Sequence, residues 1–208
     1  MVADGNDQQT ESVEGNRLAT SIGSLRLSNP VLVASGTFGY AVELSEFVQL
    51  QRLGGIVTKT VTLKPRPGNP PPRIVETPAG MLNAIGLQNI GVDQFVNNKL
   101  PLLAEIGTAI FVSIMGYTSD EFAAVVEIIN GQPGIDGLEL NLSCPNVEYH
   151  DSKGARMVAH DPELTYEVVH AVNRATNLPI IAKLSPDVPD ITVIGQAAEA
   201  AGADALTV

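Results

Sequence analysis

The sequence contains one cysteine, Cys144, in the polar stretch Asn141-Leu-Ser-Cys-Pro-Asn146 that ends an apolar run. A thiol in that position can serve as a base or a nucleophile once its pKa falls from about 8.5. A buried small hydrophobe is the alternative, since most free cysteines lie in the core. The polar neighbours of Cys144 favour the chemical role, because a core cysteine is usually flanked by apolar residues.

Two lysines, Lys59 and Lys183, come near the ends of apolar runs with the composition of buried strands. Lysine is seldom buried without a partner, so we expect both ammonium groups at an open end of the fold. There they can bind a carboxylate or phosphate, stabilise negative charge on a cofactor, or form a Schiff base. The alternative for each is a solvated lysine at a strand end.

Several asparagines near these residues offer paired donors and acceptors suited to a planar polar ring, although each alone also fits a turn. The three histidines match no metal motif, and one cysteine cannot by itself supply a four-cysteine zinc or iron–sulfur site. We therefore predict no metal site in this chain. The asparagines are Asn83, Asn89, Asn141 and Asn146.

Short apolar runs alternate with amphipathic helical segments along the chain, which favours a parallel sheet covered by helices. A helix is expected around 44–48, and others begin at Ser119, Asp161 and Asp190, the last ending at Gly202. The predicted strands are 31–34, 56–61, 109–115, 137–142, 180–184 and 205–208.

A (β/α)₈ TIM barrel is favoured over a doubly wound sheet, because no G-x-G-x-x-G follows a strand. Such barrels typically need about 250 residues. About six βα units are present in these 208 residues, so we predict an incomplete barrel that lacks its last two units. A natural six-strand half-barrel is the alternative, and two small domains are a weaker one.

Residues 64–89 interrupt the alternation with many prolines and glycines. Loops longer than about 15 residues are uncommon unless functional or disordered, and the apolar residues spread through this one disfavour disorder. We predict an ordered insert over the active-site face. Residues 1–16 are acidic and are expected to form a disordered tail, with the barrel in residues 17–208.

The charge balance excludes some partners. With 23 acidic against 12 basic residues, the formal net charge is −11, which repels nucleic acid and anionic membrane surfaces. No apolar run approaches the ~20 residues that span a bilayer, and the start lacks the basic and apolar parts of a secretory signal. We expect a cytoplasmic protein.

The chain resembles dihydroorotate dehydrogenases in several stretches that follow the family's order. The resemblance implies an FMN-binding (β/α) barrel that oxidises dihydroorotate to orotate in pyrimidine biosynthesis. The stretches are 29–39, 58–70, Asn83-Ala-Ile-Gly-Leu-Gln-Asn89, Asn141-Leu-Ser-Cys-Pro-Asn146 and Lys183-Leu-Ser-Pro186.

The resemblance also implies residue roles. Cys144 matches the base that takes the C5 proton while a hydride passes from C6 to N5 of FMN, and a cysteine here is typical of class 1 enzymes. Lys183 matches a lysine beside the flavin N1–C2=O edge, where it stabilises the anionic reduced ring. The implied substrate contacts are Lys59, Asn83, Ile85, Gly86, Leu87, Asn141 and Asn146. The implied flavin contacts are Ala34, Ser35, Gly36, Lys59, Thr60, Asn141 and Lys183.

Within class 1, residues 65–73 and 80–89 are most similar to the class 1B catalytic subunit. That subunit passes electrons to NAD through a partner carrying FAD and a [2Fe–2S] cluster, which the single cysteine agrees with. Class 1A, with fumarate as acceptor, is the lesser alternative. Family habit implies a homodimer.

Two features depart from the family. Residues 147–157 are longer and more polar than the Gly-rich family loop, and further substrate and FMN-phosphate contacts of the family would follow Val208. We therefore expect the 208-residue chain to bind FMN weakly or not at all. There are three competing interpretations. One is a dihydropyrimidine dehydrogenase-like flavin domain, although such domains usually have His in place of Asn146. The others are a Schiff-base lyase using Lys59 or Lys183, and a binding or assembly module without activity.

Overall fold

The computed structural model describes residues 17–143, 149–151 and 154–208. The predicted acidic tail at 1–16 lies outside the described residues, and so do Cys144 and Asn146. The other predicted site residues are among the described residues.

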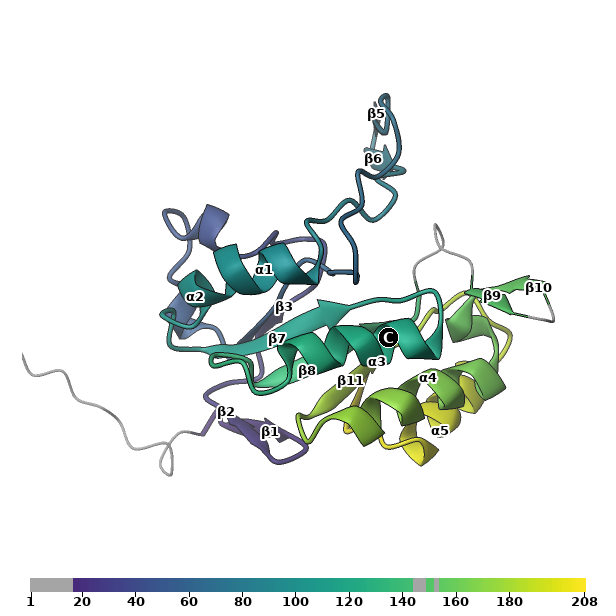
Figure 1. Cartoon of the computed structure of the whole chain (residues 1–208). Helices are drawn as coiled ribbons and strands as arrows, with labels where there is room; N and C mark the ends of the chain where they lie inside the picture. The colour runs from purple at the N-terminus through teal and green to yellow at the C-terminus, as the bar shows by residue number, and fades with distance from the viewer. Residues whose placement is uncertain (1–16, 144–148, 152–153) are drawn as a thin grey trace, which may run out of the picture.

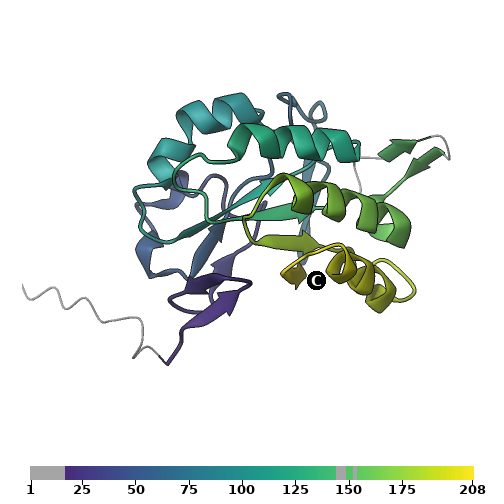
Figure 2. The ribbon, with the colours of Figure 1, turned by 60° about the horizontal axis from the view of Figure 1, so that its bottom comes forward.

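A six-stranded parallel sheet, curled in Figures 1 and 2, forms the centre of the fold. The strands are neighbours in the order in which they follow one another along the chain, as in a barrel wall and unlike a doubly wound sheet. The barrel prediction is confirmed, with β3 and β12 at the two edges of the sheet. The strands are β3 (Leu32–Val33), β4 (Gly55–Val57), β7 (Ala109–Ile114), β8 (Gly137–Asn141), β11 (Ile180–Lys183) and β12 (Ala205–Thr207).

Helices cover the outer, convex face of this sheet (Figure 2). The α-helix predicted around 44–48 is wrong: residues 45–48 form turns between two short 3₁₀ helices, η2 (Val42–Leu44) and η3 (Leu50–Arg52). Ser45 Oγ donates to the Val42 carbonyl at 2.9 Å, a local bond that competes with helix continuation. The α-helices are α1 (Val92–Asn98), α2 (Leu100–Leu103), α3 (Ser119–Ile129), α4 (Pro162–Ala175) and α5 (Ile191–Ala200).

The helix starts follow side-chain caps. The cap predicted at Ser119 lies one residue earlier, because the extended Thr118 accepts from the Glu121 N–H at 3.2 Å. Asp161 and Asp190 cap α4 and α5 as predicted, each through its carboxylate.

Apolar side chains of the central strands form two layers, because alternate residues point to opposite faces of a strand. The outer layer packs under the helices and the inner layer fills the concave face. The strand residues of the outer layer include Ile56, Ile110, Val112, Ile114, Leu138, Leu140, Ile180 and Ala182. The inner layer has Leu27, Val57, Phe111 and Ile181 at its centre.

Phe111 is the largest side chain of the inner layer and is fully buried. It fills the space left by glycines on both neighbouring strands: a Cβ on Gly137 would lie 2.6 Å from Phe111 Cδ1, and one on Gly55 would lie 3.0 Å from Phe111 Cε2. One large ring therefore packs across three strands.

A hairpin of β1 (Thr20–Ile22) and β2 (Leu25–Leu27) covers the N-terminal end of the barrel wall (Figure 1). Leu27 packs on Val57, Phe111 and Ile181 in the inner layer, with Ile22 and Leu25 beside them. The hairpin closes this end of the interior and leaves the C-terminal ends of the strands as the mouth.

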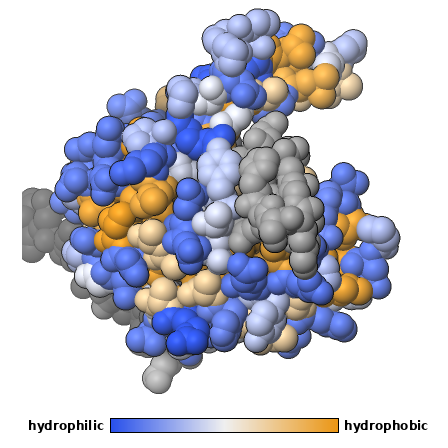
Figure 3. Space-filling model, turned by 45° about the vertical axis from the view of Figure 1, so that its right-hand side comes forward, coloured by the Kyte–Doolittle hydropathy of each residue, from blue (hydrophilic) through white to orange (hydrophobic). Residues whose placement is uncertain are grey.

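The predicted insert, residues 64–89, forms a two-stranded arm that projects from the body (Figure 1). Its strands are β5 (Ile74–Thr77) and β6 (Gly80–Asn83), and a bridge between Arg66 and Asn89 joins its base. Apolar side chains lie on its surface (Figure 3). Those more than half exposed are Ile74, Val75, Met81 and Leu82.

Asn89 forms hydrogen bonds that hold the base of the arm in place. Its side-chain oxygen accepts from the N–H groups of Thr62 at 3.2 Å and Gly91 at 2.8 Å, and its Nδ2 donates to the Leu87 carbonyl at 2.9 Å. Asn89 therefore has a structural role here.

A shorter hairpin, β9 (Tyr149–Asp151) and β10 (Gly154–Arg156), and the 3₁₀ turn η4 (Val158–His160) precede α4. They occupy the same side of the molecule as the mouth (Figure 1).

We expect Phe111→Ala to lower the free energy of unfolding by about 3–5 kcal/mol, because it opens a cavity across three strands. The matched control is Phe47→Ala, since Phe47 is 80% exposed and its loss should change stability by less than about 0.5 kcal/mol. Urea unfolding followed by circular dichroism measures both. Equal losses in the two variants would contradict the inner-layer assignment.

Candidate active site

An active site could lie at either end of the barrel wall, at the N-terminal or the C-terminal ends of the strands. In (β/α) barrels the chemistry lies at the C-terminal ends of the strands and in the loops that follow them. The hairpin β1–β2 closes the N-terminal end, so we expect the active site at the mouth.

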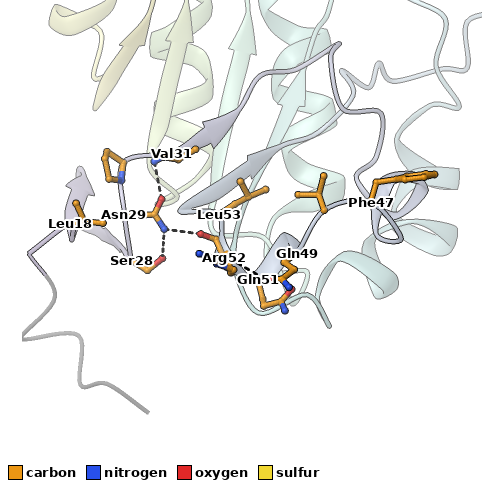
Figure 4. Close-up of a pocket in the computed structure, with 11 residues that line it drawn as sticks. Leu18, Ser28, Asn29, Val31, Phe47, Gln49, Gln51, Arg52 and Leu53 are labelled. Atoms are coloured by element: carbon orange, nitrogen blue, oxygen red, sulfur yellow. Dashed lines mark hydrogen bonds between the residues drawn. The ribbon is translucent and has the colours of Figure 1, made fainter. Parts of the chain in front are cut away.

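A cavity of about 940 Å³ lies away from the mouth, beside the start of the edge strand β3 (Figure 4). Its polar groups satisfy one another: Asn29 Nδ2 donates to the Arg52 carbonyl at 3.0 Å, and Asn29 Oδ1 accepts from the Val31 N–H at 3.0 Å. Arg52 is the charged residue among those that line it. None of the described residues predicted to do chemistry lines this cavity, so its size does not make it the candidate site.

Thr60 is the centre of a hydrogen-bonded cluster at the mouth. Its Oγ1 accepts from Asn141 Nδ2 at 3.2 Å, and lies 3.2 Å from Ser35 Oγ and 2.9 Å from Ser113 Oγ. These side chains come from β7, β8 and the segments that follow β3 and β4. Four successive units of the barrel wall thus meet at one hydroxyl group.

Lys183 lies beside this cluster. It is in register with Asn141 on β8 and with Thr207 on β12. Its side chain belongs to the inner row, because Ile181 two residues earlier packs in the inner layer and Ala182 packs in the outer one. The mouth therefore has a half-buried cation on the strand next to the Asn141 amide.

Lys59 precedes Thr60 and is also half-buried. Its N–H donates to the Gly39 carbonyl at 2.8 Å, which ties the loop after β3 to the end of β4. The backbone position of Lys59 is thereby fixed at the mouth.

The loop after β3 presents backbone to open space. Thr37 Oγ1 donates to the Ala34 carbonyl at 2.7 Å and closes a tight turn around Ser35 and Gly36. Gly36 has φ +87°, a conformation that favours glycine, and an added Cβ would meet no atom within 4 Å. Ala34 and Gly36 are exposed, so this loop can border a ligand.

The arm carries the remaining predicted contacts that the structure describes. Asn83 pairs with Ile74 at the end of β6 and is exposed, and in the described residues no hydrogen bond joins it to the Thr60 cluster. Gly86 and Leu87 are buried near the base of the arm with φ +74° and +55°, and Ile85 is half-buried. These residues are therefore not brought into the strand-end cluster.

Cys144 and Asn146 lie outside the described residues, so their predicted roles stay predictions. The last described residue before them is Ser143, whose Oγ donates to Asn141 Oδ1 at 3.4 Å.

Glu139 and Ser113 were not among the predicted site residues, and both lie in the inner row just below the mouth. Ser113 is fully buried and Glu139 is 2% exposed. Their signal in the sequence is a polar residue at every second position near the end of an apolar strand, as in Gly137-Leu-Glu-Leu-Asn141.

The Glu139 carboxyl is held away from water. Its Oε2 accepts from Thr207 Oγ1 at 3.3 Å, and its buried Oε1 has no hydrogen-bond partner in the described part of the chain. Burial raises the pKa of Glu139, and this effect outweighs the lowering by the Lys183 charge and by the hydroxyls of Thr207 and Ser113. Ser113 lies on the neighbouring strand β7, in register with Glu139.

A metal centre and a membrane span are not supported within the part of the chain that the structure describes. No three His, Cys, Asp or Glu side chains gather there in a way that could hold an ion. No helix there has the length and apolar character needed to cross a bilayer.

The parallel wall, its closed lower end and the polar strand ends define a (β/α)-barrel protein with a candidate site at the mouth. The chain belongs to the dihydroorotate dehydrogenase family, whose model matches residues 17–208. The family resemblance noted from the sequence motifs is therefore confirmed.

Similar proteins agree with this assignment. The chain is 50% identical over 191 residues to dihydroorotate dehydrogenase B (NAD(+)), catalytic subunit, of Trichlorobacter lovleyi, covering 92% of this chain and 62% of that protein. It is 51% identical over 191 residues to the protein of the same description from Desulforudis audaxviator, covering 92% and 61%. The chain thus spans about three fifths of the length of these relatives.

A solved structure shows the same fold. The crystal structure of DHODH from Eimeria tenella in complex with ferulenol superposes with a TM-score of 0.73 at 22% identity, covering 96% of this chain and 60% of that one. At this identity the likeness supports the fold alone.

We expect Thr60→Val to lower the free energy of unfolding by about 1–3 kcal/mol, because it leaves the buried Asn141 amide and Ser113 hydroxyl without a partner. Thr60→Ser keeps the hydroxyl and should lose less than half as much. Chemical denaturation of both variants measures the difference. A valine variant as stable as the serine variant would contradict the central role of the Thr60 hydroxyl.

We expect opposite pH trends from two carboxyls. Because the pKa of Glu139 is raised from 4.5, the folded state binds more protons, and this residue's contribution to stability falls as pH rises above 4.5 through the raised pKa. Glu139→Gln should remove that decline.

Glu43 is the matched comparison. Burial raises its pKa, but the hydrogen bond and charge of Lys99 and the backbone N–H of Tyr40 together hold it below 4.5, so its stabilisation is present above 4.5 and is lost as pH falls through the lowered pKa. Stability measured against pH for Glu139→Gln and Glu43→Gln, each relative to wild type, should show differences of opposite slope. The same slope in both would contradict the burial of the Glu139 carboxyl.

Proposed function

We propose that this chain forms most of the catalytic barrel of an FMN-dependent dihydroorotate dehydrogenase, which oxidises dihydroorotate to orotate in pyrimidine biosynthesis. The observation that carries the proposal is the Thr60 cluster with Lys183 beside it at the mouth, in a chain of this family. In the intact enzyme, the mouth of the barrel formed by residues 17–208 would contact the flavin ring, and the arm would border the substrate.

The residues at the mouth fit a flavin. An isoalloxazine ring is flat and polar along one edge, and the cluster offers it neutral hydroxyl and amide groups, with Lys183 on the strand next to Asn141. Lys183 would lie at the N1–C2=O edge, with Asn141 and Thr60 beside it. The exposed backbone of Ala34–Gly36 and the lysine at position 59 complete the proposed contacts. FMN, when bound, would supply a hydride acceptor.

The substrate would bind between the mouth and the arm. Lys59 would attract the carboxylate of dihydroorotate, and Asn83, Asn141 and Asn146 would bond to its ring amides. The backbone of residues 85–87 would border it, and the buried Gly86 and Leu87 would keep that border rigid. Cys144 would hold the proton removed from C5.

The names of the relatives support a partner subunit. Both are described as catalytic subunits of dihydroorotate dehydrogenase B (NAD(+)). We propose that electrons leave through a partner that carries FAD and a [2Fe–2S] cluster and reduces NAD, that the catalytic subunit is a homodimer, and that the enzyme is cytoplasmic. Fumarate as acceptor is the alternative.

The enzyme produced from its gene should bind a yellow flavin that bleaches when dihydroorotate is added without oxygen. Removal of a general base costs about 10²–10⁴-fold in rate, so Cys144→Ala should slow the bleaching by that factor while the flavin stays bound. Lys183→Met should weaken flavin binding as well as slow bleaching. Stopped-flow absorbance at the flavin band measures the rates.

Two results would contradict this proposal. A colourless enzyme would remove the flavin, and Schiff-base trapping with borohydride would then test Lys59 and Lys183 as nucleophiles. A flavin that bleaches only with a different dihydropyrimidine would keep the cofactor and change the substrate.

A further inference from the structure

Glu139 is a charged residue in an unusual position. Among the described residues it is the one buried Asp, Glu, Lys, Arg or His, at 2% exposure. Glutamate is almost never fully buried unless it is paired. Its position therefore needs a physical reason that the barrel core does not supply.

The surroundings of Glu139 leave the carboxyl incompletely satisfied. The Thr207 hydroxyl donates to Oε2 at 3.3 Å, a long bond, and Oε1 has no hydrogen-bond partner among the residues that the structure describes. A buried oxygen of this kind costs free energy unless a proton or a cation compensates it. The packing alternative would be an apolar residue, since Phe111 and Ile181 occupy the inner layer next to it.

Lys183 is the cation in reach. Glu139 pairs in register with Ile181, and Lys183 is the next residue of the same inner row, one layer nearer the mouth. Their charges attract, since Lys183 lowers the pKa of Glu139 against the larger effect of burial. The distance between the Lys183 ammonium and the Glu139 carboxyl exceeds 4 Å, since Lys99–Glu43 is the one ion pair within that distance among the described residues. The attraction thus acts through the low-dielectric interior.

We propose that Glu139 is a positioning residue for Lys183: its buried carboxylate draws the ammonium toward the inner wall and sets how strongly that ammonium stabilises negative charge on a flavin at the mouth. The proposal rests on the proposed function. It assigns Glu139 no contact with substrate or flavin, and its effect passes through Lys183.

The expected consequence is a shift in the flavin equilibrium. The reduced ring carries a negative charge that Lys183 stabilises, and Glu139 offsets part of the lysine's field. Glu139→Gln keeps the shape and removes the charge, so the midpoint potential of the bound flavin should rise. Removal of one charge in a low-dielectric interior should shift the equilibrium about tenfold toward reduced flavin, which is about 30 mV for a two-electron couple.

The test is a double-mutant cycle on the intact enzyme with its flavin, read as midpoint potential against reference dyes. Glu139→Gln should raise the potential, Lys183→Met should lower it, and Glu139→Gln should have less than half its effect when Lys183 is already Met. The control is Glu127→Gln, the same charge change at an exposed position on α3, which should leave the potential unchanged. The dissociation constant of oxidised FMN is measured for each variant as a second readout.

The possible results separate the inference about Glu139 from the proposed function. An unchanged potential in Glu139→Gln with full flavin content would overturn the inference and leave the proposed function standing. An equal shift in the Lys183→Met background would also overturn it, because Glu139 would then act directly. A colourless wild-type enzyme would overturn both. If Glu139→Gln does not fold, Thr207→Val removes the donor to Oε2 and should raise the potential by a smaller amount, and no rise would overturn the inference.

Discussion

Side chains of a β-strand alternate between its two faces, and in this protein that alternation separates two environments within each central strand. The outward residues are apolar along their whole length and pack under the helices. The inward residues change character along the strand, from Phe111 and Gly137 near the closed end to Ser113, Glu139 and Asn141 near the mouth. The whole arrangement depends on a register that keeps these inward rows level across neighbouring strands.

The inward rows connect packing to chemistry. At the closed end, the ring of Phe111 requires glycine on both neighbouring strands, which fixes how closely β4, β7 and β8 approach. Nearer the mouth, two residues beyond Phe111 and four beyond Gly137, Ser113 and Asn141 place a hydroxyl and an amide group 2.9 and 3.2 Å from Thr60 Oγ1. A one-residue slip in register would turn these polar groups toward the helices and break both layers together. Stability and site geometry therefore rest on one constraint.

Much of the fold could be predicted from the sequence, because it depends on local patterns. Apolar runs identified the six strands, and Asp161 and Asp190 marked two helix starts through their capping carboxylates. The region around 44–48 was mispredicted because Ser45 bonds back to the Val42 carbonyl, a competition that hydrophobic spacing does not reveal. The predicted cap of α3 was one residue too late, because Thr118 and Ser119 are both good capping residues and the sequence does not show which one is used.

The site was less predictable, because its contacts join residues far apart in the chain. Thr60 meets Ser113 and Asn141, which are 53 and 81 residues away, and only the barrel register brings them together. Ser113 and Glu139 carried a visible signal, a polar residue on the inner row of a buried strand. Asn83 and its neighbours on the arm depend on how a long insert folds back, which strand patterns do not encode.

The most direct test of the central claim is an experimental structure of the enzyme, produced from its gene, with FMN and orotate bound. We expect the flavin ring at the strand ends, with Lys183 at its N1–C2=O edge and Asn141 alongside, and orotate between the ring and Cys144. A flavin bound elsewhere, for example in the cavity beside Asn29 and Arg52, would contradict the assignment of the mouth as the active site.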